Sequence, residues 1–255
     1  NDMPTYYWGT GFSAGRNDDD KQKYTSQEFS AKPDLLYRIA PNTYLGLGWS
    51  FSSVHAASIQ DKDRGTLERE KAGTSVLSSG ASATFTYDTR DFVSNPQHGQ
   101  LVNLTYTYYA PGLGSDTRFD SLDSRYALYH ALDEKNVLAW EVDGRFTQGD
   151  VPWNMLPLLG SNNRMRGYYE GRYRDRNVVS TQIEYRRKLD WRHGVVGWLG
   201  TGTMGPNTRD LGQSAWLPSV GVGYRFEFKP RMNVRLDLGV GKGSTGFYFQ
   251  VGEAF

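Results

Sequence analysis

The sequence contains no cysteine and no long run of apolar residues. Without cysteine there is no disulfide framework and no thiolate metal site, which suits a protein of an oxidising compartment. Because no stretch of about 18 apolar residues occurs, the sequence predicts no transmembrane helix. The four histidines, His55, His98, His130 and His193, lack the spacing of metal ligands, so we expect no metal site. The net charge of +1 argues against nucleic acid as a partner.

The signature of outer-membrane phospholipase A is also missing, since neither His98 nor His130 stands in the His-x-Ser-Asn arrangement that activates its serine. We therefore expect a protein without enzymatic activity and without a cofactor.

Alternation of apolar and polar residues with a period of two runs through most of the chain and predicts strands. Between positions 233 and 240, for example, Val234, Leu236, Leu238 and Val240 alternate with Asn233, Arg235, Asp237 and Gly239. The runs are roughly ten residues long, which is the span of a tilted transmembrane strand, and the polar faces carry charges of both signs. A soluble β-sandwich would also alternate. The length of the runs favours an all-β fold, a transmembrane antiparallel β-barrel.

The spacing of the runs predicts about twelve strands in one domain over residues 1–255. We expect them near residues 3–15, 25–40, 43–56, 80–91, 99–110, 118–132, 135–148, 176–190, 194–204, 214–229, 231–241 and 246–255. Short connections alternate with mostly longer ones, as in bacterial outer-membrane barrels, and both termini would then be periplasmic. The final Phe255 is typical of such barrels.

Glycine is dense near both ends of the chain, at Gly9, Gly11 and Gly15 and at Gly239, Gly241, Gly243 and Gly246. Glycine weakens strand pairing, so the seam between the first and last strands could be the weakest part of the wall. Alternatively, glycines on the lumen face leave room for neighbouring side chains. The sequence leaves both readings open.

The longest connection contains an arginine-rich segment. Residues 161–177 hold five arginines and three tyrosines. An outer loop of this kind could contact lipopolysaccharide phosphates. If it instead folds into the lumen, Arg166 needs buried carboxylates, since an unpaired guanidinium is costly there. The candidate partners are Glu184, Glu141, Asp143 and Asp237.

Three stretches carry a family resemblance: LGSNNRMRGYYEGRYRDRN at 159–177, YDTRDFVSNPQHGQ at 87–100, and the closing hairpin at 233–239 and 246–255. They resemble the Val-Arg-Gly-Phe/Tyr loop, the Asp-Thr-Arg-Asp strand end and the last hairpin of the superfamily that contains BamA, TamA and the two-partner-secretion transporters, also called the bacterial surface antigen family. The resemblance implies that Arg166, Gly167 and Tyr168 form the tip of a loop folded into the lumen, with Gly167 allowing a tight turn. It also implies that Asp88, Arg90 and Asp91 belong to the strand end that the family has at this place.

The sequence departs from the family in three ways. The family usually has about sixteen strands and carries periplasmic POTRA domains, whereas this chain supplies about twelve and starts directly with a strand, so we expect no POTRA domain. Gly200 stands where the family has the aspartate partner of the loop arginine. Arg166 is therefore expected to pair with Glu184 or Asp237, or the loop is docked less firmly.

The resemblance implies a protein that translocates or assembles protein or lipid at the barrel wall, through the seam between the first and last strands. A passive small-solute channel is the alternative. The expected partners are outer-membrane lipids and lipopolysaccharide, together with a separate periplasmic protein or a second copy of the chain.

Overall fold

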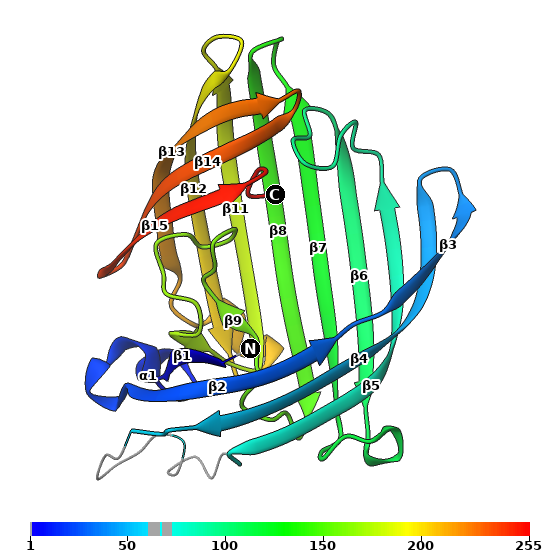
Figure 1. Ribbon diagram of the computed structural model, residues 1–255, viewed down its shortest axis with the longest axis vertical. Coiled ribbons are helices and arrows are strands. Elements are labelled where there is room, and N and C mark those ends of the chain that lie inside the picture. Colours follow the sequence, from blue (N-terminus) through cyan, green and yellow to red (C-terminus); the bar gives the residue numbers. More distant parts are fainter. Residues whose placement is uncertain (1, 61–66, 68–72) are drawn as a thin grey trace.

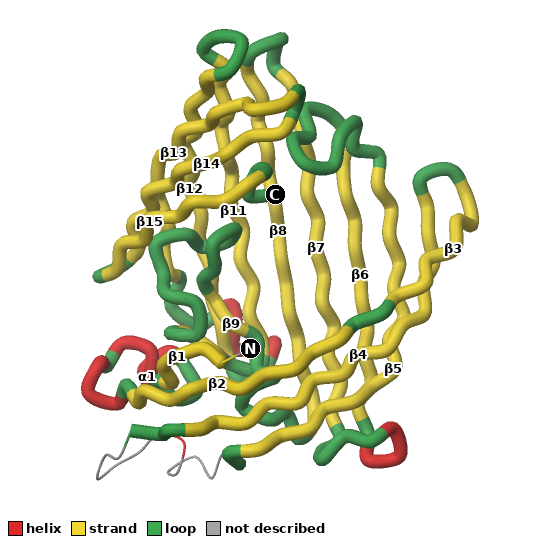
Figure 2. The backbone as a smooth tube through the Cα atoms, viewed as in Figure 1, coloured by secondary structure: helices red, strands yellow, loops and turns green. Residues whose placement is uncertain are grey.

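The computed structural model describes residues 2–60, 67 and 73–255. Its strands form one large antiparallel sheet that curves into a barrel wall (Figures 1 and 2). The strands of this sheet are β1 (Asp2–Tyr7), β2 (Gln22–Ala31), β3 (Asp34–Ala40), β4 (Thr43–Ala57), β5 (Ser75–Asp88), β6 (Gly99–Tyr109), β7 (Phe119–Ala131), β8 (Asn136–Gly149), β11 (Asn177–Lys188), β12 (His193–Gly205), β13 (Leu217–Lys229), β14 (Met232–Gly241) and β15 (Ser244–Val251).

The remaining elements are short. A two-stranded sheet pairs β9 (Leu158–Leu159) with β10 (Tyr173–Arg174). The helices are α1 (Phe12–Arg16), η1 (Asp18–Asp20), η2 (Pro111–Leu113) and η3 (Thr208–Gly212). Within the described ranges, every helix is too short to cross a membrane.

The order of the large sheet follows the sequence from β1 to β15, and β2 and β3 both pair with β4. β2 pairs with residues 51–57 of β4 and β3 with residues 43–48. The two therefore share one position in the wall, which gives the twelve positions expected from the alternation. The break between them lies at Lys32 and Pro33. Proline has no N–H to donate to a ladder, so it divides the strand that we expected at 25–40.

Two other expected strands are shorter in the structure. The strand expected at 3–15 ends at Tyr7, since Gly9 and Gly11 take positive φ angles of 99° and 96° and a helix follows. The strand expected at 246–255 ends at Val251. Gly252 then turns with φ 89°, and Phe255 is buried inside the wall, where its ring lies 6.1 Å from that of Tyr129 on β7. Most of the expected connection 57–74 lies outside the described residues.

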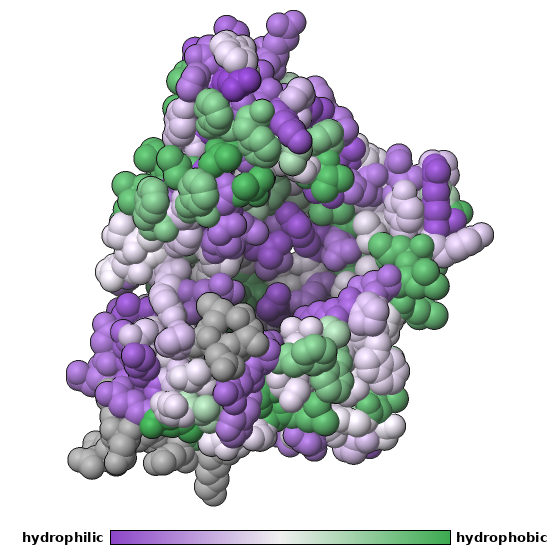
Figure 3. Space-filling view, in the orientation of Figure 1, coloured by the Kyte–Doolittle hydropathy of each residue, from purple (hydrophilic) through white to green (hydrophobic). Residues whose placement is uncertain are grey.

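The two faces of the wall are opposite in character to those of a soluble protein. On β14, Asn233, Arg235 and Asp237 are buried inside, while Leu238 and Val240 are exposed outside, at 47% and 44%. This pattern is the one expected of a barrel whose outer face contacts lipid and whose lumen is polar. Figure 3 shows the polar interior through the opening between the upper and lower parts of the wall.

Five connections lie at the upper end of the barrel in Figure 1: residues 41–42, 89–98, 132–135, 189–192 and 230–231. We call this the short-turn end. The opposite end carries longer connections, among them 206–216 between β12 and β13.

The two edges of the sheet are β1 and β15. Among the described residues these strands form no ladder with each other, and Figure 1 shows them apart. An unpaired edge leaves backbone N–H and C=O groups that need partners within a membrane. What lies between the two edges therefore matters for function.

Candidate functional site

The connection between β8 and β11, residues 150–176, folds into the lumen; we call it the lumen loop. Its β9–β10 pair and its tip bury a set of apolar side chains against the wall. This cluster consists of Leu159, Met165, Tyr168 and Tyr173 of the loop with Val178, Met204 and Leu217 of the wall. Burial of this apolar surface is the main term that favours an inward loop over a solvated one.

Arg166 lies at the tip of the lumen loop and is completely buried. Its Nη1 donates to Oδ2 of Asp237 and its Nη2 donates to Oε2 of Glu184, each at 2.5 Å. Its guanidinium also lies over the ring of Trp198, 3.6 Å from the centroid. One arginine thus ties the loop to β14, β11 and β12. A guanidinium can do this because its donors project in a planar fork.

Both carboxylates have second arginine partners. Asp237 accepts from Nη1 of Arg225 at 2.6 Å, and Glu184 accepts from Nε of Arg186 at 2.8 Å. The site is a network of buried charges. Because each carboxylate also has an arginine of the wall as partner, the wall holds both carboxylates independently of the loop arginine.

Glycines create the space into which the tip fits. Gly167 turns with φ 109°, a conformation that L residues with side chains rarely adopt. On β14, a Cβ at Gly239 would lie 2.7 Å from the carbonyl carbon of Arg166, and a Cβ at Gly241 would lie 2.4 Å from the ring of Tyr168. At Gly239 and Gly241, the contacts agree with the second of the two alternatives above, that glycines on the lumen face leave room for neighbouring side chains.

The tip also contacts the last strands through the backbone. The amide of Gly167 donates to the hydroxyl of Tyr248 on β15 at 2.8 Å. The hydroxyl of Tyr168 donates to the carbonyl of Pro218 and accepts from the amide of Lys242, both at 2.7 Å. The tip is therefore attached to β13, to β15 and to the β14–β15 turn.

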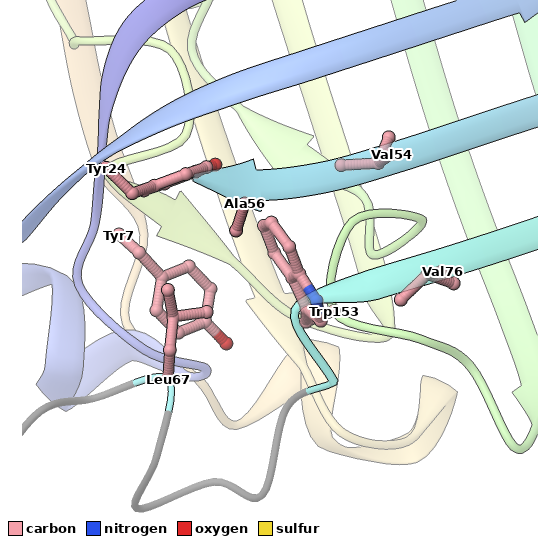
Figure 4. Close-up of a cluster of buried hydrophobic side chains, with 7 residues drawn as sticks. All are labelled: Tyr7, Tyr24, Val54, Ala56, Leu67, Val76 and Trp153. Atoms are coloured by element: carbon pink, nitrogen blue, oxygen red, sulfur yellow. The ribbon is translucent and has the colours of Figure 1, made fainter. Parts of the chain in front are cut away.

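The base of the lumen loop contacts the first strands. In Figure 4, Trp153 points between Tyr7 of β1 and Tyr24 of β2. The ring centroids lie 5.6 Å and 5.5 Å from that of Trp153, with edge-on geometry. The guanidinium of Arg174 lies 4.6 Å from the ring centroid of Tyr7, and its carbonyl accepts from the amide of Gly11 at 2.9 Å. The loop thus spans the open side of the sheet, with its base on β1 and β2 and its tip on β13 to β15.

The remaining candidate partners of Arg166 belong to a separate pair of contacts. Glu141 on β8 accepts from Nε of Arg164 at 3.1 Å and from Nε of Arg125 at 2.7 Å, not from Arg166. Asp143 pairs with Arg164 at 3.3 Å. Arg164 and Arg166 of the inward loop therefore each take a different pair of carboxylates.

The strand-end motif lies at the short-turn end. Asp88 accepts from Nε and Nη2 of Arg90, at 2.9 Å and 2.7 Å. Asp91 accepts from the amide of Gln97 at 3.0 Å and from Nη2 of Arg231 at 2.7 Å. The motif shapes the β5–β6 turn and links it to the β13–β14 turn, and among the described residues it makes no hydrogen bond or ion pair with the lumen loop.

Two features of the site were not anticipated from the sequence. Trp198, two residues before Gly200, supplies the ring under Arg166. At Gly200 itself, the nearest side chain is that of Gln182, whose amide donates to Glu141 at 2.9 Å and to the carbonyl of Asn163 at 3.0 Å. An aromatic in an alternating strand gives no signal that separates a cation–π partner from a packing residue.

The described residues contain no group of three or more potential metal ligands. The chemistry that the site offers is ion pairing and hydrogen bonding between a loop and a wall. It can hold or release the loop, and its contacts are divided between the two edges of the sheet.

Comparisons with known proteins agree with this geometry. Residues 3–255 match the Omp85 superfamily domain. Solved structures with the same fold include BamA from Haemophilus ducreyi lacking POTRA domains 1–3 (TM-score 0.63, 15% identity, 98% of this chain and 57% of that chain covered) and CdiB from Escherichia coli (TM-score 0.61, 12% identity, 98% and 48% covered). CdiB from Acinetobacter baumannii is also similar (TM-score 0.55, 15% identity, 91% and 42% covered).

A search of curated proteins finds no match at the sequence level. The chain spans about half the length of the solved structures that it resembles. At these low identities the solved structures establish the fold, an outer-membrane β-barrel, and the domain match establishes the family. The chain belongs to the Omp85 superfamily.

Proposed function

We propose that this chain is a non-enzymatic outer-membrane barrel that translocates or assembles polypeptide or lipid at its wall, between the first and last strands. The observation that carries the proposal is the lumen loop, which contacts β1 and β2 at its base and β13 to β15 at its tip. A segment that holds both edges controls whether they can separate. We propose that the short-turn end and both termini face the periplasm.

In this mechanism the docked loop bridges the two unpaired edges of the wall and holds them in a fixed relation. Arg166 holds β14 through Asp237, and the amide of Gly167 holds β15 through Tyr248. Undocking of the tip releases the last strand, whose outward residues Phe247, Phe249 and Val251 are 61% to 69% exposed. The edge of β15, which pairs with no strand other than β14 among the described residues, presents backbone donors and acceptors to a polypeptide strand, and its apolar face presents a surface to lipid.

The partners in this proposal are outer-membrane lipids and lipopolysaccharide around the wall. A separate periplasmic protein, or a second copy of the chain, would deliver the substrate to the short-turn end.

Planar-bilayer conductance tests the role of the loop. We expect the wild-type chain to be closed and a variant in which residues 160–171 are replaced by a short Gly-Ser linker to conduct, because the tip no longer fills the lumen. The matched control shortens residues 207–213 of the β12–β13 connection, and it should stay closed. Stable open steps in the wild type, with no change on shortening the lumen loop, would instead favour a passive small-solute channel.

Photo-crosslinking in cells tests the seam. A photoreactive residue replaces Phe249 on the outer face of β15, and the control replaces Leu104 on the outer face of β6, which is also exposed. Polypeptide adducts are expected at position 249 and not at position 104, and lipopolysaccharide adducts are expected to be more abundant at position 249. Equal adducts at both positions would remove the seam from the mechanism and leave the loop's role standing.

A further inference from the structure

A cavity of about 130 Å³ lies at the short-turn end, apart from the loop tip. Its walls come from the β5–β6 and β7–β8 turns and from the ends of β11, β12, β13 and β14. The lumen loop contributes no residue to it. Arg186 and Arg225, which pair with Glu184 and Asp237 behind the loop tip, also line this cavity, but no ligand of the cavity enters the mechanism described above.

Positive charge dominates the lining. Seven lysine and arginine side chains and three glutamates contribute to it. Four of these cations are already paired: Arg225 with Glu253 at 2.6 Å, Lys188 with Glu227 at 3.6 Å, and Arg186 and Arg231 with Glu184 and Asp91, which lie outside the lining. Lys135 and Arg192 have no carboxylate within 4.0 Å among the described residues. The cavity therefore keeps an excess of positive charge, which attracts anions.

Guanidinium groups of the wall also keep unused donors. Arg225 is only 4% exposed, and its Nε and Nη1 donate to Glu253 and Asp237, but its Nη2 has no acceptor among the described residues. The same holds for Nε of Arg231. A buried donor without an acceptor is unfavourable, and a ligand with several acceptor oxygens would remove that penalty.

We propose that this cavity binds a phosphate group, either free or as part of a lipid headgroup. A phosphate has acceptor oxygens pointing in several directions and carries enough negative charge for more than one cation. Lys188, Arg192 and Arg225 approach the cavity from three different strands or turns, an arrangement that suits a tetrahedral anion better than a planar carboxylate. The proposal does not depend on whether the seam opens.

Isothermal titration calorimetry of the full chain in detergent, in a phosphate-free buffer of low ionic strength, tests the site. The two ligands are inorganic phosphate and a short-chain phosphatidylglycerol below its micelle concentration. Saturable binding of either one is expected, weakening as salt is raised. Tighter binding of the lipid identifies a headgroup site, and equal or tighter binding of inorganic phosphate identifies a free-phosphate site. No saturable heat with either ligand overturns the proposal.

Variants show where the ligand binds. Lys188→Gln and Arg192→Gln should each weaken binding about tenfold or more, and the double variant more than either. Both residues lie at the ends of strands or in turns, so the fold is retained, and a thermal melt confirms it. The control, Lys242→Gln, removes an exposed lysine at the opposite end of the barrel and should bind as the wild type does. Wild-type affinity in the double variant would overturn the proposal, because any binding would then be to an adventitious ion site elsewhere.

Discussion

Replacement of Arg166 by alanine is the perturbation with the largest expected effect. The side chain is completely buried and bonded to Asp237 and Glu184. Removing one partner from a buried ion pair costs about 3 to 5 kcal/mol, because a carboxylate is left in a poorly solvated place. Here each carboxylate keeps another arginine, Arg225 or Arg186, so the lower end of that range applies. Loss of the contact with the Trp198 ring adds about 1 kcal/mol.

We therefore expect Arg166→Ala to lower the free energy of unfolding by about 3 to 4 kcal/mol, measured by urea unfolding in lipid vesicles. Arg166→Lys keeps the charge but lacks a planar fork, so it should bond to one carboxylate at a time and give an intermediate loss. The control is Arg176→Ala, at an exposed position of the same loop, which should stay within about 0.5 kcal/mol of the wild type. If Arg166→Ala is as mild as the control, the buried ion pairs do not hold the loop.

Three smaller perturbations test other contacts. Gly239→Ala should destabilise by about 1 to 3 kcal/mol, since its methyl group meets the backbone of the loop tip, whereas Gly197→Ala, with no atom within 4 Å of the added Cβ, should be neutral. Tyr168→Phe leaves a carbonyl and an amide without their partner and should cost about 1 to 3 kcal/mol in the same unfolding assay, and no loss would mean that the hydroxyl does not fix the tip. Burial raises the pKa of the Asp91 carboxyl, but hydrogen bonds from two turn amides and a guanidinium outweigh it and leave the pKa below its ordinary 3.8. The carboxylate therefore stabilises the turn above pH 3.8, and this stabilisation is lost as the pH falls through the lowered pKa of the folded state. Amide hydrogen exchange in residues 92–98 should rise over that pH range in the wild type. The variant Asp91→Asn should show no such step.

The alternation of apolar and polar residues predicted the wall strands, because a strand with one face in lipid and one in a polar lumen must alternate over its full length. It could not predict where each strand ends. Lys32 and Pro33 divide a run whose side chains continue to alternate, and only the missing N–H of proline marks the break. Near the start, Gly9 and Gly11 turn the chain away from the sheet through positive φ, and a glycine in a strand pattern is equally compatible with extended backbone.

The contacts of Arg166 were partly accessible from sequence, because Glu184 and Asp237 stand on the polar faces of their strands and the family resemblance placed the arginine in the lumen. Glu141 also stands on the polar face of its strand, so the alternation made it an equally good candidate partner of Arg166. In the structure it pairs with Arg164 instead. What separates these carboxylates is their height along the barrel axis relative to the loop tip, which depends on strand register and on the path of the loop. Neither the register nor the path of the loop can be predicted from the local sequence.

The contact of the loop base with β1 and β2 was not anticipated from the sequence, because the residues that meet are far apart in the chain and belong to no motif. Trp153 lies in the loop with no motif around it, and Tyr7 and Tyr24 look like ordinary strand aromatics. Their meeting depends on the curvature that brings the first strands back toward the loop (Figures 1 and 4).

The distance between the two edges tests the central claim, that the lumen loop holds the first and last strands in a fixed relation. The chain has no cysteine, so spin labels at Ser30→Cys on β2 and Gln250→Cys on β15, both exposed, report that distance alone by double electron–electron resonance in lipid nanodiscs. We predict one narrow distance distribution in the labelled wild-type background and a broader or longer one when Arg166→Ala is added. An unchanged narrow distribution in the Arg166→Ala background would contradict the account, since the edges would then be held without the docked loop.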